Sequence, residues 1–275
     1  MTNEETKTAL YATEVVRRLA VSKSVIAIAI LQGVRLILAA VRAFMNKGAL
    51  MRALLELRDE TAGAEFTAFI EIMERLESVC YTIDTALFIF NLAALICPAL
   101  VVTGTLMLYF GAKKECDYTS YRGALILRIS CYAHIAYIAA ILAVAAVIVY
   151  SVSPQLLLSG TSFFVLLILS VPVIFLIRLA HVLNGIECAF LEVPESVVHS
   201  TFVNVSCKVI FGFCLASVIL EIINSSSDAI SIALNACTAA TFFALSNLLK
   251  NYRLRLGSSE RKAETLTELI VNDKE

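Results

Sequence analysis

The residues that could do chemistry in this chain are polar, ionisable or helix-breaking groups placed inside long apolar runs. Such groups are costly in lipid, so each is a candidate for binding a solute, relaying a proton or bending a helix. Six positions qualify as candidate intramembrane functional residues: Arg35, Gln32, Pro98, His134, Pro172 and Glu221.

Arg35 and Gln32 lie near the middle of the apolar run 24–44 and are its most expensive feature. An arginine at the centre of a span costs about 2.5–3.5 kcal/mol on the insertion scale, far more than one Leu or Ile recovers. The cost falls if Arg35 faces a cavity, or if it meets Glu221 or Asp84 across the bundle. We therefore expect this run either to span with the help of partner helices or to lie in the membrane interface.

His134 and the two prolines each have a functional and an ordinary interpretation. His134 could respond to protons, whereas the commoner case is a neutral imidazole bonded to a neighbouring helix. Pro98 and Pro172 each remove a backbone hydrogen bond and could hinge a transporter helix. Membrane spans also tolerate prolines that only bend them, so the ordinary interpretation leads.

Four basic residues are predicted near the cytoplasmic ends of spans, where they would form an inner rim. Binding of anionic lipid headgroups explains such a rim without any substrate. The candidates for this rim are Arg128, Arg178, His181 and Lys208.

The elements that must position these residues are transmembrane helices. No Asp, Glu, Lys or Arg occurs between Ile129 and Ile177, and one helix of that length would measure about 70 Å, more than twice the hydrocarbon thickness of a bilayer. Folding back near Pro154 makes two spans. Further apolar runs predict the other spans: Ser24–Phe44, Thr85–Phe110, Val205–Ile223 and Ala229–Leu249.

The predicted fold is therefore an all-α, polytopic bundle of six spans, or five if the run 24–44 does not cross. Lys and Arg gather in the loop 111–123 and after Leu249, whereas the turns 151–155 and 224–227 contain none. The positive-inside rule then predicts a cytoplasmic C-terminus, and the membrane we expect is the cell membrane. The predicted segments are a cytoplasmic N-terminal segment (1–23), the first span (24–44), an outer-side region (45–82), a five-span bundle (83–250) and a cytoplasmic tail (251–275).

Two further patterns concern packing. Apolar residues at helical spacing between Phe66 and Cys80 predict an amphipathic outer helix with an acidic polar face, which favours packing against protein over lipid. Small residues four apart allow close helix approach and predict a compact bundle. These small residues are Ala136, Ala139, Ala140, Ala143, Gly212, Ala216, Ala229, Ala233, Cys237 and Thr241.

Several classes of function are disfavoured by missing patterns. The sequence has no GxxxxGK[ST], HExxH or GxSxG motif, so we expect no ATPase of its own and no enzyme activity. Cys131 and His134 have no second ligand pair nearby, so no metal or other cofactor is predicted. A net charge of −1 gives no reason to expect nucleic-acid binding.

Two functions remain after these exclusions. The first is a transport or permease-type component, for which a separate ATPase could dock on the predicted loop 184–204. The second is a non-catalytic membrane scaffold or regulatory subunit that contacts a partner membrane protein through its spans and its acidic outer helix. A polar path through the bundle would favour transport, and a dry, alanine-packed centre would favour the scaffold.

Overall fold

The structure, a computed structural model, describes residues 13–49, 51–52, 55–56, 81, 83–152, 160–191, 201–223 and 228–272. Shorter helical segments, 13–20 and 83–94, precede the first two long helices. No strand occurs in the described residues, so the all-α prediction is confirmed. The long helices are α2 (Lys23–Met45), α5 (Ile96–Lys113), α6 (Asp117–Val152), α8 (Gly160–Phe190), α9 (Thr201–Ile223) and α10 (Ala229–Asn272).

Six helical stretches are long and apolar enough to cross a bilayer, and the chain is therefore an integral membrane protein. They are helical because lipid offers no partner for backbone groups, which must bond within the segment. The run 24–44 forms α2, which at about 1.5 Å per residue has spanning length. The spans are Lys23–Met45, Ile83–Lys113, Asp117–Val144, Ser170–Phe190, Thr201–Ile223 and Ala229–Asn251.

Two predicted features fall partly or wholly outside this description. The amphipathic helix at 66–80 lies outside the described residues, as does 153–159, which contains most of the predicted hairpin turn. The tail beyond Asn251 continues α10 as a helix to Asn272.

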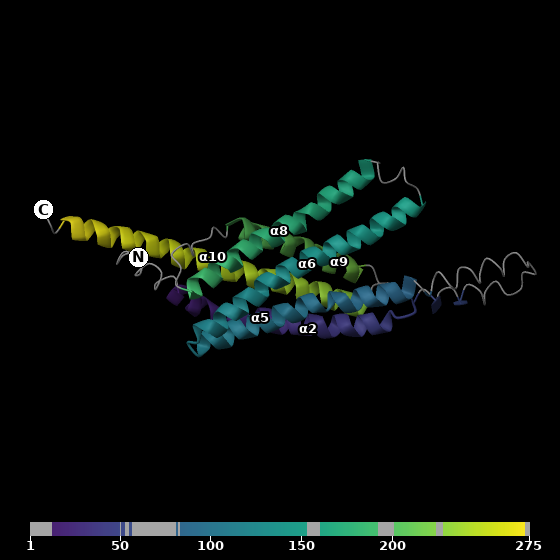
Figure 1. The fold of residues 1–275 in the computed structure, drawn as a ribbon, viewed down its shortest axis with the longest axis horizontal. Coiled ribbons are helices and arrows are strands. Elements are labelled where there is room, and N and C mark those ends of the chain that lie inside the picture. Colours follow the sequence, from purple (N-terminus) through teal and green to yellow (C-terminus); the bar gives the residue numbers. More distant parts are fainter. Residues whose placement is uncertain are drawn as a thin grey trace, which may run out of the picture.

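The six helices form a ring in which each packs against its neighbours in the chain. The main contacts join α2 to α5, α5 to α6, α6 to α8, α8 to α9 and α9 to α10. The ring is completed by α10, which packs against α2. Figure 1 shows this bundle side-on, with α6 and α8 diverging from α2 and α5 at the end away from the chain termini.

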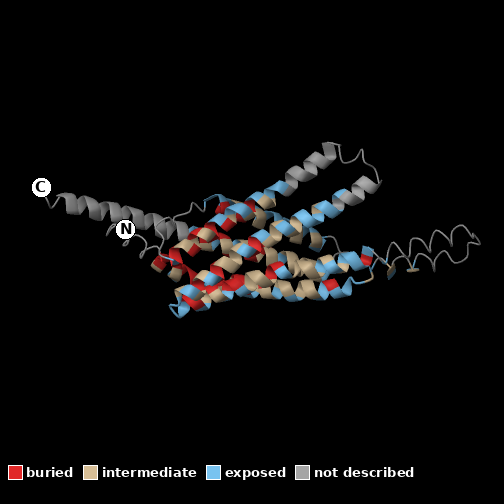
Figure 2. Cartoon of the chain, viewed as in Figure 1, coloured by how far each residue is buried: buried red, intermediate tan, exposed pale blue. Residues whose placement is uncertain are grey.

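The two ends of the bundle differ in packing. We call the end that holds the C-termini of α5 and α8 the closed end, and the opposite end the open end. Buried residues gather toward the closed end, whereas exposed ones predominate along the diverging helices (Figure 2). The main core cluster at the closed end consists of Val15, Val16, Leu19, Ala20, Leu108, Ala112, Ala124, Ala189 and Phe190.

A close contact between α5 and α6 depends on glycine. A Cβ atom on Gly123 would lie 2.4 Å from the backbone nitrogen of Leu108, and one on Gly111 would lie 2.6 Å from that of Ser120. Gly104 faces the same contact, where a Cβ would lie 2.8 Å from Leu127 Cγ. Backbones approach this closely only where no side chain intervenes.

Some of the predicted small-residue stripes do not make such contacts. Gly212 has no atom within 4 Å of a Cβ position, and Ala136 and Ala140 are exposed. The α10 stripe does face a neighbour, because Thr241 bonds to Gln32 of α2. The predicted small-residue contacts are therefore wrong at Gly212, Ala136 and Ala140, whereas the α10 stripe packs as predicted.

The two predicted helix-breaking prolines behave differently. The helix is interrupted at Leu95, three residues before the buried Pro98. Proline at 98 has no N–H to bond the carbonyl of Ala94, and its ring crowds that carbonyl, which explains the interruption. Pro172 lies inside α8, which continues from Gly160 to Phe190.

Candidate functional site

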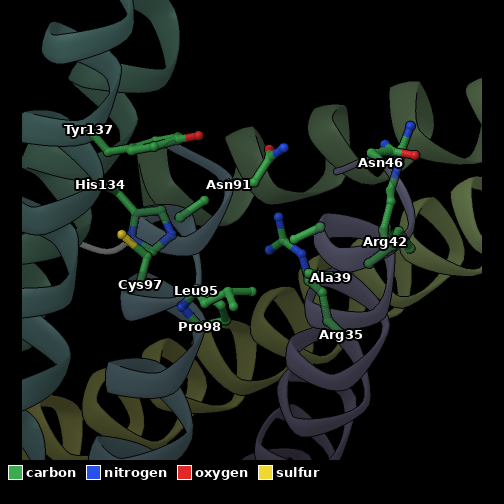
Figure 3. Close-up of a pocket in the computed structure, with 13 residues that line it drawn as sticks. Arg35, Ala39, Arg42, Asn46, Asn91, Leu95, Cys97, Pro98, His134 and Tyr137 are labelled. Carbon is green, nitrogen blue, oxygen red and sulfur yellow. The ribbon is translucent and has the colours of Figure 1, made fainter. Parts of the chain in front are cut away.

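A cavity of about 350 Å³ lies between α2, the segment 83–94, α5 and α6. This volume is at the small end of the range of about 300–1,000 Å³ typical of small-molecule sites. Figure 3 shows the lining side chains, with those of α2 on one side and His134 and Tyr137 of α6 on the other. The lining residues are Arg35, Ala39, Arg42, Ala43, Asn46, Asn91, Ala94, Leu95, Cys97, Pro98, His134, Tyr137 and Leu234.

Arg35 is the deepest charge in this cavity. It lies about 18 Å along α2 from Lys23, close to the middle of a hydrocarbon layer about 30 Å thick. Its side chain points from α2 into the cavity (Figure 3), and it is half-buried. Within the described residues Arg35 makes no ion pair and no hydrogen bond, although Cys97, Cys214 and Cys237 lie within electrostatic range of it.

The hypothesis that Arg35 meets Glu221 or Asp84 is not realised. Glu221 of α9 accepts a hydrogen bond from Asn235 Nδ2 of α10 at 2.7 Å. Asp84 is buried, and its Oδ2 accepts the backbone N–H of Met51 at 2.8 Å. Neither carboxylate lines the cavity, so Arg35 keeps its hydrogen-bonding capacity.

Gln32 lies one helical turn from Arg35, toward the closed end, and does not line the cavity. Its side chain is buried, and Nε2 donates to Thr241 Oγ1 at 3.0 Å. The Thr241 hydroxyl in turn donates to the carbonyl of Cys237 at 2.8 Å. Gln32 therefore joins α2 to α10 on the closed-end side of the cavity and is not part of the cavity wall.

His134 lines the cavity on α6, but its ring also bonds within its own helix. Nδ1 lies 2.7 Å from the carbonyl oxygen of Ser130, and a carbonyl can only accept. Nδ1 therefore carries the hydrogen, which leaves Nε2 as the nitrogen available for another partner. The predicted bond to a neighbouring helix is replaced by one inside α6.

Pro98 joins the cavity through the helix interruption described above. Ala94, whose carbonyl loses its helical N–H partner, lines the cavity together with Leu95 and Pro98. The broken segment therefore contributes an apolar wall to the cavity, and it includes a carbonyl that has lost its i→i−4 donor. Of the six candidates, the structure brings Arg35, Pro98 and His134 together, and it places Gln32, Pro172 and Glu221 outside the cavity lining.

Of the four residues of the predicted basic rim, one is bonded to a neighbouring helix and three are exposed. Arg128 Nε lies 3.0 Å from Glu187 Oε1 of α8, and Arg128 also donates to Asn184 Oδ1. Arg178, His181 and Lys208 are exposed on α8 and α9. Arg128 therefore holds α6 to α8.

The loop predicted at 184–204 is wrong over its first residues, because α8 continues to Phe190. Glu187, expected on a docking surface, is instead buried, with a relative exposure of 4%. The remaining loop residues 192–200 lie outside the described ranges.

Polar contacts across helices reinforce the closed end, and the sequence patterns did not reveal them. Arg17 Nη2 donates to both carboxylate oxygens of Asp117 at 2.9 Å, and this bond raises the pKa of Arg17 above its ordinary value. Ser246 of α10 donates to Asn204 Oδ1 of α9 at 2.7 Å. These contacts hold the helices together at the closed end.

No family model, curated protein or solved structure matches the chain. In the part of the chain that the structure describes, no three His, Cys, Asp or Glu side chains gather as metal ligands.

Proposed function

We propose that this integral membrane protein is a transport or permease-type component that moves a small solute through the cavity between α2, α5 and α6. The observation that carries the proposal is Arg35, a charge at mid-membrane depth that lines a cavity and has no counter-ion among the described residues. An ionisable group inside a membrane is expensive and normally marks a pathway for a substrate or ion.

A carrier accounts for the asymmetry of the bundle better than a channel does. Channels provide a continuous path, whereas a carrier opens its binding site to one side at a time. Here the helices diverge at the open end (Figure 1), and an apolar core closes the other. The helix interruption beside Pro98 supplies a hinge next to the cavity.

The alternative is the non-catalytic scaffold. The alanine-containing core of the closed end fits a scaffold, but a scaffold gives no reason to keep an arginine on a cavity wall at a high cost in free energy.

We place the closed end in the cytoplasm, because Lys and Arg concentrate there. These basic residues are Arg17, Arg18, Lys23, Lys113, Lys114, Arg122 and Lys250.

The test asks whether the cavity is reached from both sides of the membrane. Ala39 lines the cavity one turn from Arg35, and an Ala39→Cys side chain is small enough to occupy that position. Oriented proteoliposomes are treated from either side with a membrane-impermeant methanethiosulfonate, and modification at each cysteine is quantified by mass spectrometry. We expect modification from the open-end side, and slower modification from the closed-end side.

Native cysteines supply the controls. Cys116, exposed at the closed end, reports which side the reagent reaches, and the fully buried Cys207 reports that the protein stays folded. If Ala39→Cys stays unmodified from the closed-end side after Cys116 has reacted completely, the cavity has one entrance and the carrier proposal is wrong.

A further inference from the structure

Building on the proposed function, we infer that the solute is a small organic anion whose charged end is a carboxylate bound by Arg35. A guanidinium has five N–H donors arranged to match two carboxylate oxygens. In Figure 3 the Arg35 side chain extends into the cavity between the α2 wall and the residues of α5 and α6, where a ligand oxygen could accept its bonds.

The charge of the cavity lining has one sign. Arg35 and Arg42 are seven residues apart on α2, which places them about 10 Å apart along the helix axis. Both line the cavity, and no Asp or Glu is among the described residues that do. A positive wall with no compensating acid attracts anions and repels cations.

The two carboxylates that were predicted to meet Arg35 are engaged elsewhere. Glu221 is bonded by Asn235, and Asp84 by the backbone of Met51. The Arg35 guanidinium loses hydration at mid-membrane depth, and an anionic ligand would supply the counter-ion that compensates for this loss.

The rest of the lining indicates the body of the ligand. Ala39, Leu95, Pro98 and Leu234 are apolar and surround the same space as Arg35. The lining also holds donor side chains, among them Arg42, Asn91 and Tyr137. The apolar residues suit a hydrocarbon body, and they offer inorganic phosphate no donor on their side. Two arginines together with this apolar surface, in a cavity of about 350 Å³, therefore fit a small carboxylate with a hydrocarbon body.

The experiment measures ligand binding by thermal unfolding of the full chain in nanodiscs. The probes are the saturated monocarboxylates from acetate to hexanoate, their uncharged primary amides and inorganic phosphate. We expect saturable stabilisation by the carboxylates that strengthens with chain length, and none by the amides. Equal stabilisation by acids and amides would overturn the inference, as would phosphate binding more tightly than every carboxylate.

Variants locate the site. Arg35→Gln should weaken carboxylate binding at least tenfold. Arg35→Lys should weaken it less, because lysine keeps the positive charge although it lacks the paired N–H donors of the guanidinium. Arg122→Gln removes an exposed arginine from α6 outside the cavity lining and should leave binding unchanged. If Arg35→Gln does not fold, Ala39→Leu provides the same test by filling the cavity with Arg35 in place. Unchanged affinity in the folded Arg35 variants, or in Ala39→Leu, overturns the inference.

This result is separable from the test of transport. Carboxylate binding together with one-sided access to Ala39→Cys would sustain the anion site and overturn the carrier. Two-sided access without any preference for carboxylates over amides would sustain the carrier and overturn the anion site.

Discussion

Gly123 of α6 lies directly against the backbone of Leu108 in α5. A Cβ atom on Gly123 would come 2.4 Å from the Leu108 nitrogen and 2.8 Å from the Gly104 carbonyl oxygen. Both of these neighbours are backbone atoms of a helix, so neither can turn aside as a flexible side chain does. The position therefore admits glycine alone without separating the two helices.

Replacing this glycine should destabilise the bundle. For Gly123→Ala we expect a loss of about 1–3 kcal/mol, the usual cost of overpacking a tight contact, seen as a lower midpoint of thermal unfolding in detergent. Gly212→Ala is the matched control, because nothing lies within 4 Å of its Cβ position. Alanine there should be neutral or should stabilise the helix by up to about 1 kcal/mol. Equal effects of the two substitutions would contradict the close contact.

The second prediction concerns the ion pair between Arg128 and Glu187. The Glu187 side chain is only 5% exposed and that of Arg128 is 27% exposed, so Glu187→Gln leaves a partly buried Arg128 charge without its ion-pair partner. Breaking a fully buried pair on one side costs about 3–5 kcal/mol, and the partial exposure of Arg128 should bring the loss to the low end of that range or below it. We expect a correspondingly lower midpoint of thermal unfolding, and partial recovery when Arg128→Met is added to Glu187→Gln.

The control for this pair is Glu14→Gln. Glu14 pairs with Arg18 at 2.6 Å, but both side chains are exposed. Exposed pairs contribute about 0–1 kcal/mol, so this change should have little effect. If Glu187→Gln is as mild as Glu14→Gln, α6 and α8 are not joined by the Arg128 pair.

The third prediction uses the thiol of Cys116 in the turn between α5 and α6. Cys116 Sγ lies 3.2 Å from Thr119 Oγ1, and this hydrogen bond lowers the pKa of the exposed thiol below its ordinary value. Since the thiolate is the reactive form, alkylation of Cys116 should rise with pH at lower values than for an unperturbed thiol.

Thr119 should set this pH dependence. Thr119→Val removes the hydroxyl that stabilises the thiolate, so the pKa of Cys116 should rise and alkylation near neutral pH should slow. Thr119→Ser keeps a hydroxyl and should retain the wild-type profile. Rates are measured with a maleimide by mass spectrometry of the Cys116 peptide, and identical profiles for the Val and Ser variants would rule out the bond.

The apolar runs predicted the all-α bundle, because lipid forces every backbone group to bond internally, but they left open whether the run 24–44 spans. They also singled out Arg35, Pro98 and His134, which share one cavity. Hydropathy does not indicate which faces of two helices pack against each other. The close contact of Gly104 and Gly123 therefore escaped prediction, and exposed small residues such as Gly212 were expected to pack. The end of α8 was predicted too early because a glutamate such as Glu187 after an apolar run indicates a loop. Its ion pair with Arg128 on α6 cannot be inferred from the sequence.

The last prediction compares the two intramembrane prolines. The helix is interrupted at Leu95, next to Pro98, whereas α8 continues through Pro172. Pro98→Ala restores an N–H that can bond the carbonyl of Ala94. Because Pro98 is the third residue of α5, the gain should be smaller than the about 3 kcal/mol that proline costs in a helix interior. We therefore expect Pro98→Ala to raise the midpoint of thermal unfolding.

The same change should impair opening of the cavity, because Ala94, Leu95 and Pro98 all line it. In the Ala39→Cys background, Pro98→Ala should slow methanethiosulfonate modification from the closed-end side, since a straightened helix loses the hinge needed to expose the cavity there. Pro172→Ala should leave this rate close to that of Ala39→Cys alone. Faster or unchanged modification in Pro98→Ala would show that the interruption at Leu95 shapes the cavity wall without acting as a hinge.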